Sequence, residues 1–223
     1  MILIFDLDDT LYPEHTFVES GFSAVATMLA NEFGWEERQS KVHMLDILSL
    51  KGRGVVFDEL LRSHGAYSAR LVQRCVQTYR QHLPGGIALY PEAQAFMNKN
   101  RGRAMYLVTD GNKNVQANKV KALGLETYFK KIFITHRYGV HHAKPSVHCF
   151  SLIREIEKCY WSDLAYIGDN PAKDFVNLNP LNVLTIRVKT GEHAAVKAKT
   201  GFDARIHINS IQNLPSILNE VAI

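Results

Sequence analysis

Six short apolar runs are the most regular feature of the hydrophobic pattern. They are too short for helices and rich in branched and aromatic side chains, which is typical of strands buried on both faces. Helical patterns lie between most of them. We predict strands at residues 2–5, 104–108, 131–134, 164–167 and 183–188, with 204–208 as a weaker sixth.

Two of the intervening segments have clear helical spacing. Residues 113–123 carry Val115, Val120 and Leu123 on one face and stop at Gly124, and residues 145–158 start with Pro145. Strand alternating with helix is the signature of a parallel sheet covered on both sides. We therefore predict an α/β fold, a three-layer, Rossmann-like parallel sheet.

Residues 14–85 interrupt this alternation because they contain helical patterns and nothing that looks like a strand. We predict an inserted helical-bundle cap at 14–85 and an α/β core formed by 1–13 and 86–223. An insertion after the first strand stands at the carboxyl edge of the sheet, where open α/β folds bind ligands, so it could act as a lid. The expected helices are 15–33, 36–50, 54–63 and 67–82.

The composition is that of an ordinary globular protein. The chain has 223 residues, of which 46% are hydrophobic and 22% charged, and a formal net charge of +4. Because this charge is mild and its Lys and Arg are scattered, we expect no nucleic-acid partner. No apolar run approaches the roughly 20 residues of a membrane span, so we expect no membrane partner either.

The three cysteines, Cys75, Cys149 and Cys159, have no C-x-x-C spacing. Neither a disulfide framework nor a thiolate metal site is indicated. The first residues lack the basic flank and the long apolar region of a signal peptide. A reducing, cytoplasmic location is the expectation from these features. The oligomeric state is left open.

Three acidic residues directly follow the first apolar run, in "MILIFDLDDT". In an extended segment Asp6 and Asp8 project to one side and Asp9 to the other. Two carboxylates in one small volume repel each other unless a cation is bound. These residues alone leave two interpretations open: a solvated acidic turn, or a site for a cation.

The ends of later strands add polar groups that suit a metal and a phosphate. Thr109 in "LVTDGN" places a hydroxyl and neighbouring backbone amides at a helix start, and Lys144 in "HHAKPS" is a cation. Asp169 and Asp174 in "GDNPAKD" form a second acidic pair. Carboxylates suit a hard divalent cation, while Thr109 and Lys144 suit an anion.

These segments, D-L-D-D-T at 6–10, Thr109, Lys144 and G-D-N-P-A-K-D at 168–174, resemble the four motifs of the haloacid dehalogenase-like hydrolases in order and spacing. The resemblance extends over the whole chain, because the insertion looks like the small helical cap of that family. It implies Asp6 as the nucleophile that forms an aspartyl-phosphate and Asp8 as the general acid and base.

The resemblance also implies a Mg²⁺ cofactor and an anion pocket. The metal would be held by Asp6, the main-chain carbonyl of Asp8 and Asp169, with Asp174 in the outer shell. Thr109 and Lys144 would bind the phosphoryl oxygens as part of the catalytic set. The remaining phosphate-binding groups would be Thr10 and the backbone amides of Asp110 and Gly111.

Within that family, Asp8 and Thr10 narrow the reaction. Family dehalogenases lack the second carboxylate, because a departing halide needs no proton, so Asp8 disfavours dehalogenation. Sugar phosphomutases typically read D-x-D-G where this chain has Thr10. We therefore predict a Mg²⁺-dependent phosphomonoesterase for a small phosphorylated metabolite such as a sugar phosphate, a nucleotide or a phosphoglycolate-like acid. A sugar phosphomutase and a catalytically silent binding module remain the alternatives.

Some tempting residues have simpler interpretations. Asp9 is expected to hold the loop by a hydrogen bond or to contact the insertion. His141 and His142 are adjacent, so their side chains diverge, and a surface loop is favoured over a metal site. Lys173 is expected to face solvent or to pair with a carboxylate.

Overall fold

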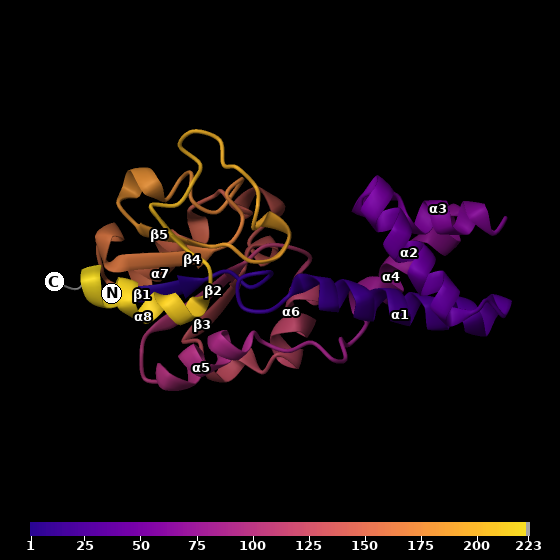
Figure 1. Ribbon diagram of the computed structural model, residues 1–223, viewed down its shortest axis with the longest axis horizontal. Helices are drawn as coiled ribbons and strands as arrows, with labels where there is room; N and C mark the ends of the chain where they lie inside the picture. Colours follow the sequence, from indigo (N-terminus) through magenta and orange to yellow (C-terminus); the bar gives the residue numbers. More distant parts are fainter. Residues whose placement is uncertain (222–223) are drawn as a thin grey trace. The chain divides into compact units, whose positions relative to one another are not determined.

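The computed structural model describes residues 1–221 and shows two compact units. One unit combines Met1–Glu14 with the chain from Ala88 onward, and the other spans His15–Ile87. The first contains the sheet and the second is wholly helical among its described residues (Figure 1).

The described part of the first unit is built on six parallel strands in the order β3-β2-β1-β4-β5-β6. The prediction of a parallel sheet is confirmed, although most strands start or end a residue or two away from the predicted bounds. Thr109 and Gly168 therefore belong to strands instead of following them. The strands are β1 (Ile2–Phe5), β2 (Met105–Thr109), β3 (Lys131–Ile134), β4 (Leu164–Gly168), β5 (Leu184–Val188) and β6 (Ile206–Ile208).

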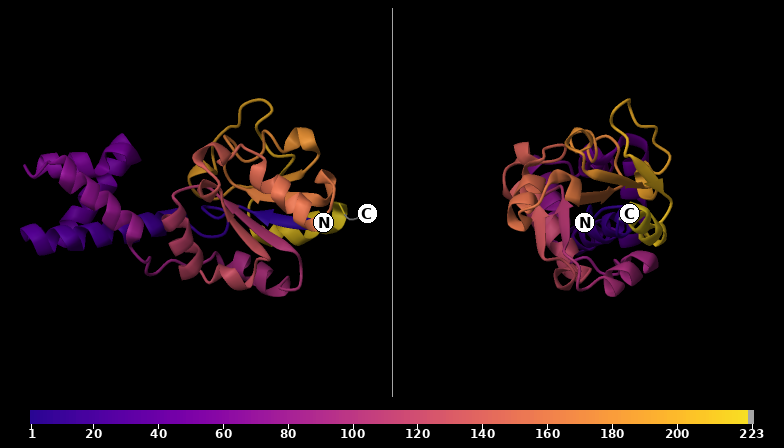
Figure 2. Two further views of the ribbon diagram at one scale, coloured as in Figure 1. Left: turned by 180° about the vertical axis from the view of Figure 1, so that it is seen from behind. Right: turned by 90° about the vertical axis from the view of Figure 1, so that its left-hand side faces the viewer.

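Both faces of the sheet are buried, because neighbouring residues of β1 point into different layers. Ile4 pairs with Tyr106 and Tyr166 and lies with them in the cluster that includes Phe150 of helix α7 (His148–Glu157). On the other face, Phe5 contacts Phe96 of α5 (Pro91–Lys99), with ring centroids 5.9 Å apart. Helices on both sides of the sheet complete the three layers (Figure 2).

Two further core helices are α6 (Lys113–Ala122) and α8 (Leu214–Val221). Helices α5 and α8 were not predicted. In α5 the signal was present, since Pro91 occupies the first turn and buried Ala93, Phe96 and Met97 follow at helical spacing.

The predicted start of the helix at 145 was wrong, because α7 begins at His148. Residues before it form a turn in which Ser146 N donates to the carbonyl of Ala143 at 2.9 Å. The Ser146 hydroxyl then accepts from His148 N at 3.3 Å.

Short 3-10 turns connect many of these elements. They are Arg53–Val55, Leu125–Thr127, Thr135–Arg137, Val140–His142, Trp161–Asp163, Asn179–Leu181, Gly191–His193 and Ile211–Asn213.

The helical unit has its own core. Phe22, Val25 and Leu29 of α1 (Glu14–Phe33) pack in one buried cluster with Leu60 of α3 (Val56–Ser63) and Cys75 of α4 (Ala69–Gln81). The four predicted helical segments are observed, with bounds shifted by a few residues. They are α1 (Glu14–Phe33), α2 (Glu37–Lys51), α3 (Val56–Ser63) and α4 (Ala69–Gln81).

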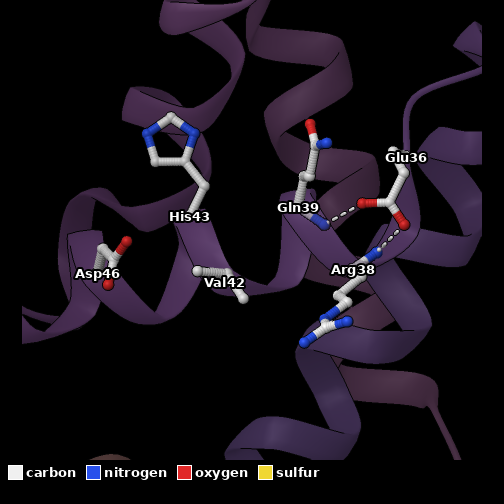
Figure 3. Close-up of a pocket in the computed structure, with 6 residues that line it drawn as sticks. All are labelled: Glu36, Arg38, Gln39, Val42, His43 and Asp46. Carbon is white, nitrogen blue, oxygen red and sulfur yellow. Dashed lines mark hydrogen bonds between the residues drawn. The ribbon is translucent and has the colours of Figure 1, made fainter.

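Side-chain caps start two of these helices. The Glu36 carboxylate accepts from Arg38 N at 3.0 Å and from Gln39 N at 2.5 Å, which satisfies backbone groups at the start of α2 (Figure 3). Ser68 does the same for Leu71 N in α4, at 3.2 Å. Over residues 1–221 we find no helix with the length and apolar character needed to cross a bilayer.

Candidate active site

The carboxyl ends of β1 and β4 bring three aspartates together. Asp6 follows β1 and Asp169 follows β4, and these strands are parallel neighbours with Phe5 paired to Ile167. Asp174 joins them from the loop after Asp169. Each of the three offers an oxygen atom within 4.8 Å of the other two, and all three residues are buried. The structure therefore gathers the predicted metal-binding side chains into one place.

Lys144 lies against this acidic group and is itself buried. Its Nζ is 2.9 Å from Asp6 Oδ1 and 2.7 Å from Asp174 Oδ1, and it donates to the Tyr166 hydroxyl at 2.8 Å. The Tyr166 hydroxyl donates in turn to Asp174 Oδ1 at 3.1 Å. One ammonium group is thus shared by two carboxylates.

The positive charge of Lys144 does not balance the negative charge that the three aspartates would carry when ionised. Burial raises the pKa of Asp6 to about 6, even though Lys144 acts in the opposite direction. Burial, followed by the charges of Asp6 and Asp174, raises the pKa of Asp169 to about 9. An all-oxygen site that disfavours its own ionised form fits a hard divalent cation.

Gly168 makes room for this arrangement. A Cβ at that position would lie 2.6 Å from Asp174 Oδ2. Without the Cβ, Asp174 Oδ2 can also accept from Asn170 N at 2.9 Å. Since Lys144 and Tyr166 engage its other oxygen, the Asp174 carboxylate already has partners on both oxygens.

Asp8 has a different environment from Asp6. Its Oδ1 lies 2.6 Å from Lys119 Nζ and accepts from the Tyr12 hydroxyl at 2.7 Å, while its Oδ2 accepts from Gln116 Nε2 at 2.9 Å. Burial by itself raises the pKa of Asp8, but Lys119 and these hydrogen bonds reverse the shift and lower it. Three donors therefore hold the side chain of Asp8 in place.

Of the predicted phosphate-binding residues, Thr109 is the last residue of β2, and Thr10, Asp110, Gly111 and Lys144 lie outside the helices and strands. The Thr109 hydroxyl accepts from Gln116 Nε2, and the Thr10 hydroxyl donates to Asp169 Oδ1 at 3.5 Å. The Asp110 carboxylate accepts from Thr135 Oγ1 at 2.7 Å and from Lys144 N at 3.1 Å. Gly111, the next residue, has a φ of +133°, a conformation that favours glycine.

The comparisons with known proteins agree with this geometry. A family model described as haloacid dehalogenase-like hydrolase matches residues 1–175. The chain belongs to the haloacid dehalogenase-like hydrolases. The resemblance predicted from the four motifs is thereby confirmed.

Among members with assigned activities, a glyceraldehyde 3-phosphate phosphatase of Methanocaldococcus jannaschii is 26% identical over 225 residues, covering 98% of this chain and 97% of the relative. A phosphoserine phosphatase of Thermus thermophilus is 29% identical over 138 residues, which cover 61% of this chain and 54% of the relative.

Solved structures of this hydrolase family share the fold. The HAD-hydrolase YfnB from Bacillus subtilis, bound to magnesium, matches with a TM-score of 0.68 and 19% identity, covering 98% of both chains.

Asp9 is not part of the acidic group in this hydrolase; it fastens the loop after β1. It has a φ of +53°, and its carboxylate accepts from Glu14 N at 2.9 Å and from Glu192 N at 3.0 Å. Gly191, with a φ of +61°, lies so close that a Cβ there would be 2.0 Å from Asp9 Cγ. The interpretation of Asp9 as a loop-holding residue is confirmed.

A polar cavity of about 160 Å³ is lined by four of the predicted site residues, Asp6, Asp8, Asp110 and Asp169. Thr10, Thr109, Gly111, Lys144 and Asp174 do not line it. Sequence reasoning did not select Asn170, His193 or Glu14, which also line it, and it assigned Lys173 no role beyond a pair with a carboxylate. That pair is observed, with Lys173 Nζ 3.3 Å from Asp110 Oδ2. The cavity is lined by Asp6, Asp8, Asp9, Glu14, Asp110, Asp169, Asn170, Lys173 and His193.

Gln116, Lys119 and Tyr12 were also missed as partners of Asp8. The available signal was modest: Gln116 and Lys119 are polar residues three apart in a helix, beside the apolar Val115 and Val120. In the structure both are almost fully buried in α6. Polar side chains on the inward face of a predicted helix could have pointed to a buried partner.

His141 and His142 lie in the loop before Lys144, as expected, but they do not diverge. The ring centroids of His141 and His142 are 4.0 Å apart, and those of His142 and His148 are 3.9 Å apart.

These histidines do not form a group of metal-ligand atoms. Within residues 1–221, the group whose ligand atoms come close enough for a metal is that of Asp6, Asp169 and Asp174.

The helical unit has a separate, open hollow of about 560 Å³ along α2. It is lined by Glu36, Arg38, Gln39, Val42, His43 and Asp46 (Figure 3). None of the predicted site residues lies there, and the Glu36 carboxylate is engaged in capping the helix.

Proposed function

We propose that this hydrolase is a Mg²⁺-dependent phosphomonoesterase that acts on a small phosphorylated metabolite. The observation that carries the proposal is the buried group of Asp6, Asp169 and Asp174 with Lys144 bound between two of its members. It combines a nucleophile, oxygen ligands for a cation and a fixed positive charge at the carboxyl edge of a parallel sheet, where such folds bind ligands.

Asp6 is proposed as the nucleophile. One of its carboxylate oxygens attacks phosphorus, the bond between phosphorus and the ester oxygen breaks, and the departing alkoxide takes a proton from Asp8. Water then attacks the aspartyl-phosphate, Asp8 takes up its proton, and the bond between phosphorus and Asp6 breaks to release phosphate. Both steps conserve atoms, electrons and protons without a further reactant.

Mg²⁺ would be held by Asp6, Asp169 and the main-chain carbonyl of Asp8. Asp174 is assigned to the outer shell because both of its oxygens already accept hydrogen bonds or an ion pair from Lys144, Tyr166 and Asn170. When bound, the cation supplies the positive charge that lets an anionic ester approach an anionic carboxylate. The raised pKa values of Asp6 and Asp169 support this assignment.

The phosphoryl oxygens are proposed to bind Lys144, the Thr109 hydroxyl and the backbone amides of Asp110 and Gly111. Thr10 contributes to the pocket by its hydrogen bond to Asp169. All of these groups belong to the unit that contains the sheet.

The substrate is proposed to be small, with short phosphorylated sugars or acids as the first candidates. The similarity to a glyceraldehyde 3-phosphate phosphatase over nearly the whole of both chains favours a three-carbon ester. The helical unit at 15–87 is proposed to act as the cap that admits substrate and excludes water. A cytoplasmic location stays a prediction.

The test is a panel of phosphate esters assayed with and without Mg²⁺ for the wild type and Asp6→Asn. We expect release of phosphate only with Mg²⁺, and none by Asp6→Asn. Asp46→Asn, which changes an exposed aspartate of α2, is the matched control and should keep full activity. Turnover by Asp6→Asn at the wild-type rate would contradict the proposal. Phosphate transferred to another carbon of the substrate, instead of being released, would favour a mutase.

A further inference from the structure

Helix α6 contacts two residues of the proposed reaction, Asp8 and Thr109. Gln116 and Lys119 lie one turn apart in α6, and they are 1% and 2% exposed. Both contact Asp8, which is more than a hundred positions earlier in the chain. Burial of a lysine and an amide on the inner face of a helix is costly unless every polar group finds a partner.

Gln116 connects the acid to the phosphate-binding hydroxyl. Its Nε2 donates to Asp8 Oδ2 at 2.9 Å and to Thr109 Oγ1 at 2.5 Å. A side-chain amide nitrogen has two hydrogens, so both bonds can form together. Because the Thr109 hydroxyl accepts from Gln116, its own hydrogen is left to donate to a phosphoryl oxygen.

Lys119 and Tyr12 both donate to the same oxygen of Asp8. Both donate to Oδ1, at 2.6 Å and 2.7 Å, and together they use both of its lone pairs. Among the described residues, Oδ2 accepts from Gln116 Nε2. Lys119 is also 3.6 Å from Glu14 Oε1, so its ammonium is held from two sides.

We propose that Gln116 and Lys119 are positioning residues that fix the carboxylate of Asp8 relative to the Thr109 hydroxyl. Lys119 and Tyr12 donate to Oδ1, and Oδ2 shares the Gln116 amide nitrogen with the Thr109 hydroxyl. The inference rests on the proposed phosphatase function, because it concerns how Asp8 acts in that reaction.

The experiment compares Gln116→Leu and Lys119→Met with the wild type on two esters in the presence of Mg²⁺. One ester is p-nitrophenyl phosphate, whose leaving group needs no proton, and the other is an alkyl phosphate, glyceraldehyde 3-phosphate. We expect kcat/KM to fall about 10-fold to 100-fold on the alkyl ester and less than about 3-fold on the aryl ester. Lys121→Met, at an exposed lysine of the same helix, is the matched control and should behave as wild type.

Two further variants separate positioning from a general structural defect. Lys119→Arg keeps the positive charge and should recover most of the alkyl-ester activity. Combining Lys119→Met with Asp8→Asn should be no slower than Asp8→Asn alone, because Lys119 acts through Asp8. These two results hold even if Lys119→Met lowers the melting temperature, which is measured alongside.

Equal losses on both esters, or additive losses in the double variant, would overturn the positioning role while leaving the phosphatase proposal intact. Unchanged activity of both single variants would do the same. A wild-type protein that releases phosphate from neither ester would overturn the proposed function, and the inference with it.

Discussion

Two aspartates two positions apart in the chain occupy opposite electrostatic environments. Asp6 shares a buried space with Asp169 and Asp174, and its pKa is raised to about 6 by burial in spite of Lys144. Asp8 is surrounded by donors, and its pKa is lowered. The first site has more negative than positive charge, whereas Asp8 in the second accepts from three donors. Neighbouring side chains, and not residue type, assign the two carboxylates different chemistry.

The largest expected effect is the loss of activity when Asp8 is replaced. If it exchanges a proton with the substrate, Asp8→Asn should slow hydrolysis of alkyl phosphates about 10²-fold to 10⁴-fold and affect aryl phosphates far less. The measurement is kcat/KM across esters of increasing leaving-group basicity. Equal loss on all esters would show that Asp8 is not the proton donor.

Replacing Lys144 measures how much the ammonium group shared by Asp6 and Asp174 contributes to stability. Lys144→Met leaves Asp6 and Asp174 without their ion-pair partner in a buried site, and breaking such a pair costs about 3–5 kcal/mol of unfolding free energy. Urea unfolding of the metal-free protein measures it. Lys113→Met, at an exposed lysine at the start of α6, should cost less than about 0.5 kcal/mol. A similar small cost for Lys144→Met would contradict the described ion pairs.

A bound Mg²⁺ should compensate the excess negative charge around Asp6, which the surroundings of Asp8 do not have. Mg²⁺ at 100 times its dissociation constant should stabilise the wild type by about 2.7 kcal/mol, because it binds only the folded state. Thermal unfolding with and without Mg²⁺ measures the shift. Asp46→Asn should keep it and Asp169→Asn should lose it.

We also expect Asp169→Asn to change the stability of the metal-free protein. A carboxyl whose pKa is raised to about 9 in the folded protein destabilises the fold at any pH above its unfolded value. Replacing it with a neutral amide should therefore stabilise the metal-free protein at neutral pH. A less stable metal-free variant would argue against repulsion within the acidic group.

The smallest effect concerns the loop that carries Asp8 and Asp9. Gly191→Ala places a Cβ 2.0 Å from Asp9 Cγ at a φ of +61°, whereas Gly201→Ala, at a φ of +81°, meets nothing within 4 Å. Both substitutions place an alanine in a left-handed backbone conformation, so the difference between their unfolding free energies reports the contact with Asp9. We expect Gly191→Ala to be about 1–3 kcal/mol less stable than Gly201→Ala in urea unfolding. Equal stabilities would mean that Asp9 can move away freely.

The parallel sheet and the edge that carries the acidic group could be predicted, because both depend on local pattern. Alternating apolar runs and helices specify a parallel sheet, and parallel strands deliver their carboxyl ends to one edge. Asp6, Thr109 and Asp169 each stand at such an end, so their meeting follows from the topology. Local signals are also sufficient for α5, since Pro91 and the spacing of Phe96 and Met97 mark a helix.

By itself, then, the sequence determined the family and the α/β class, and it predicted that Asp169, Asp174 and Lys144 meet Asp6. Only the tertiary structure decided the environment of Asp8, because its contacts with Gln116 and Lys119 span 108 and 111 positions. Such contacts depend on the rotation of α6 about its axis and on how closely it approaches the loop after β1. A difference of one residue in helix phase, about 100°, would turn both side chains away from Asp8, and no local pattern specifies it that finely.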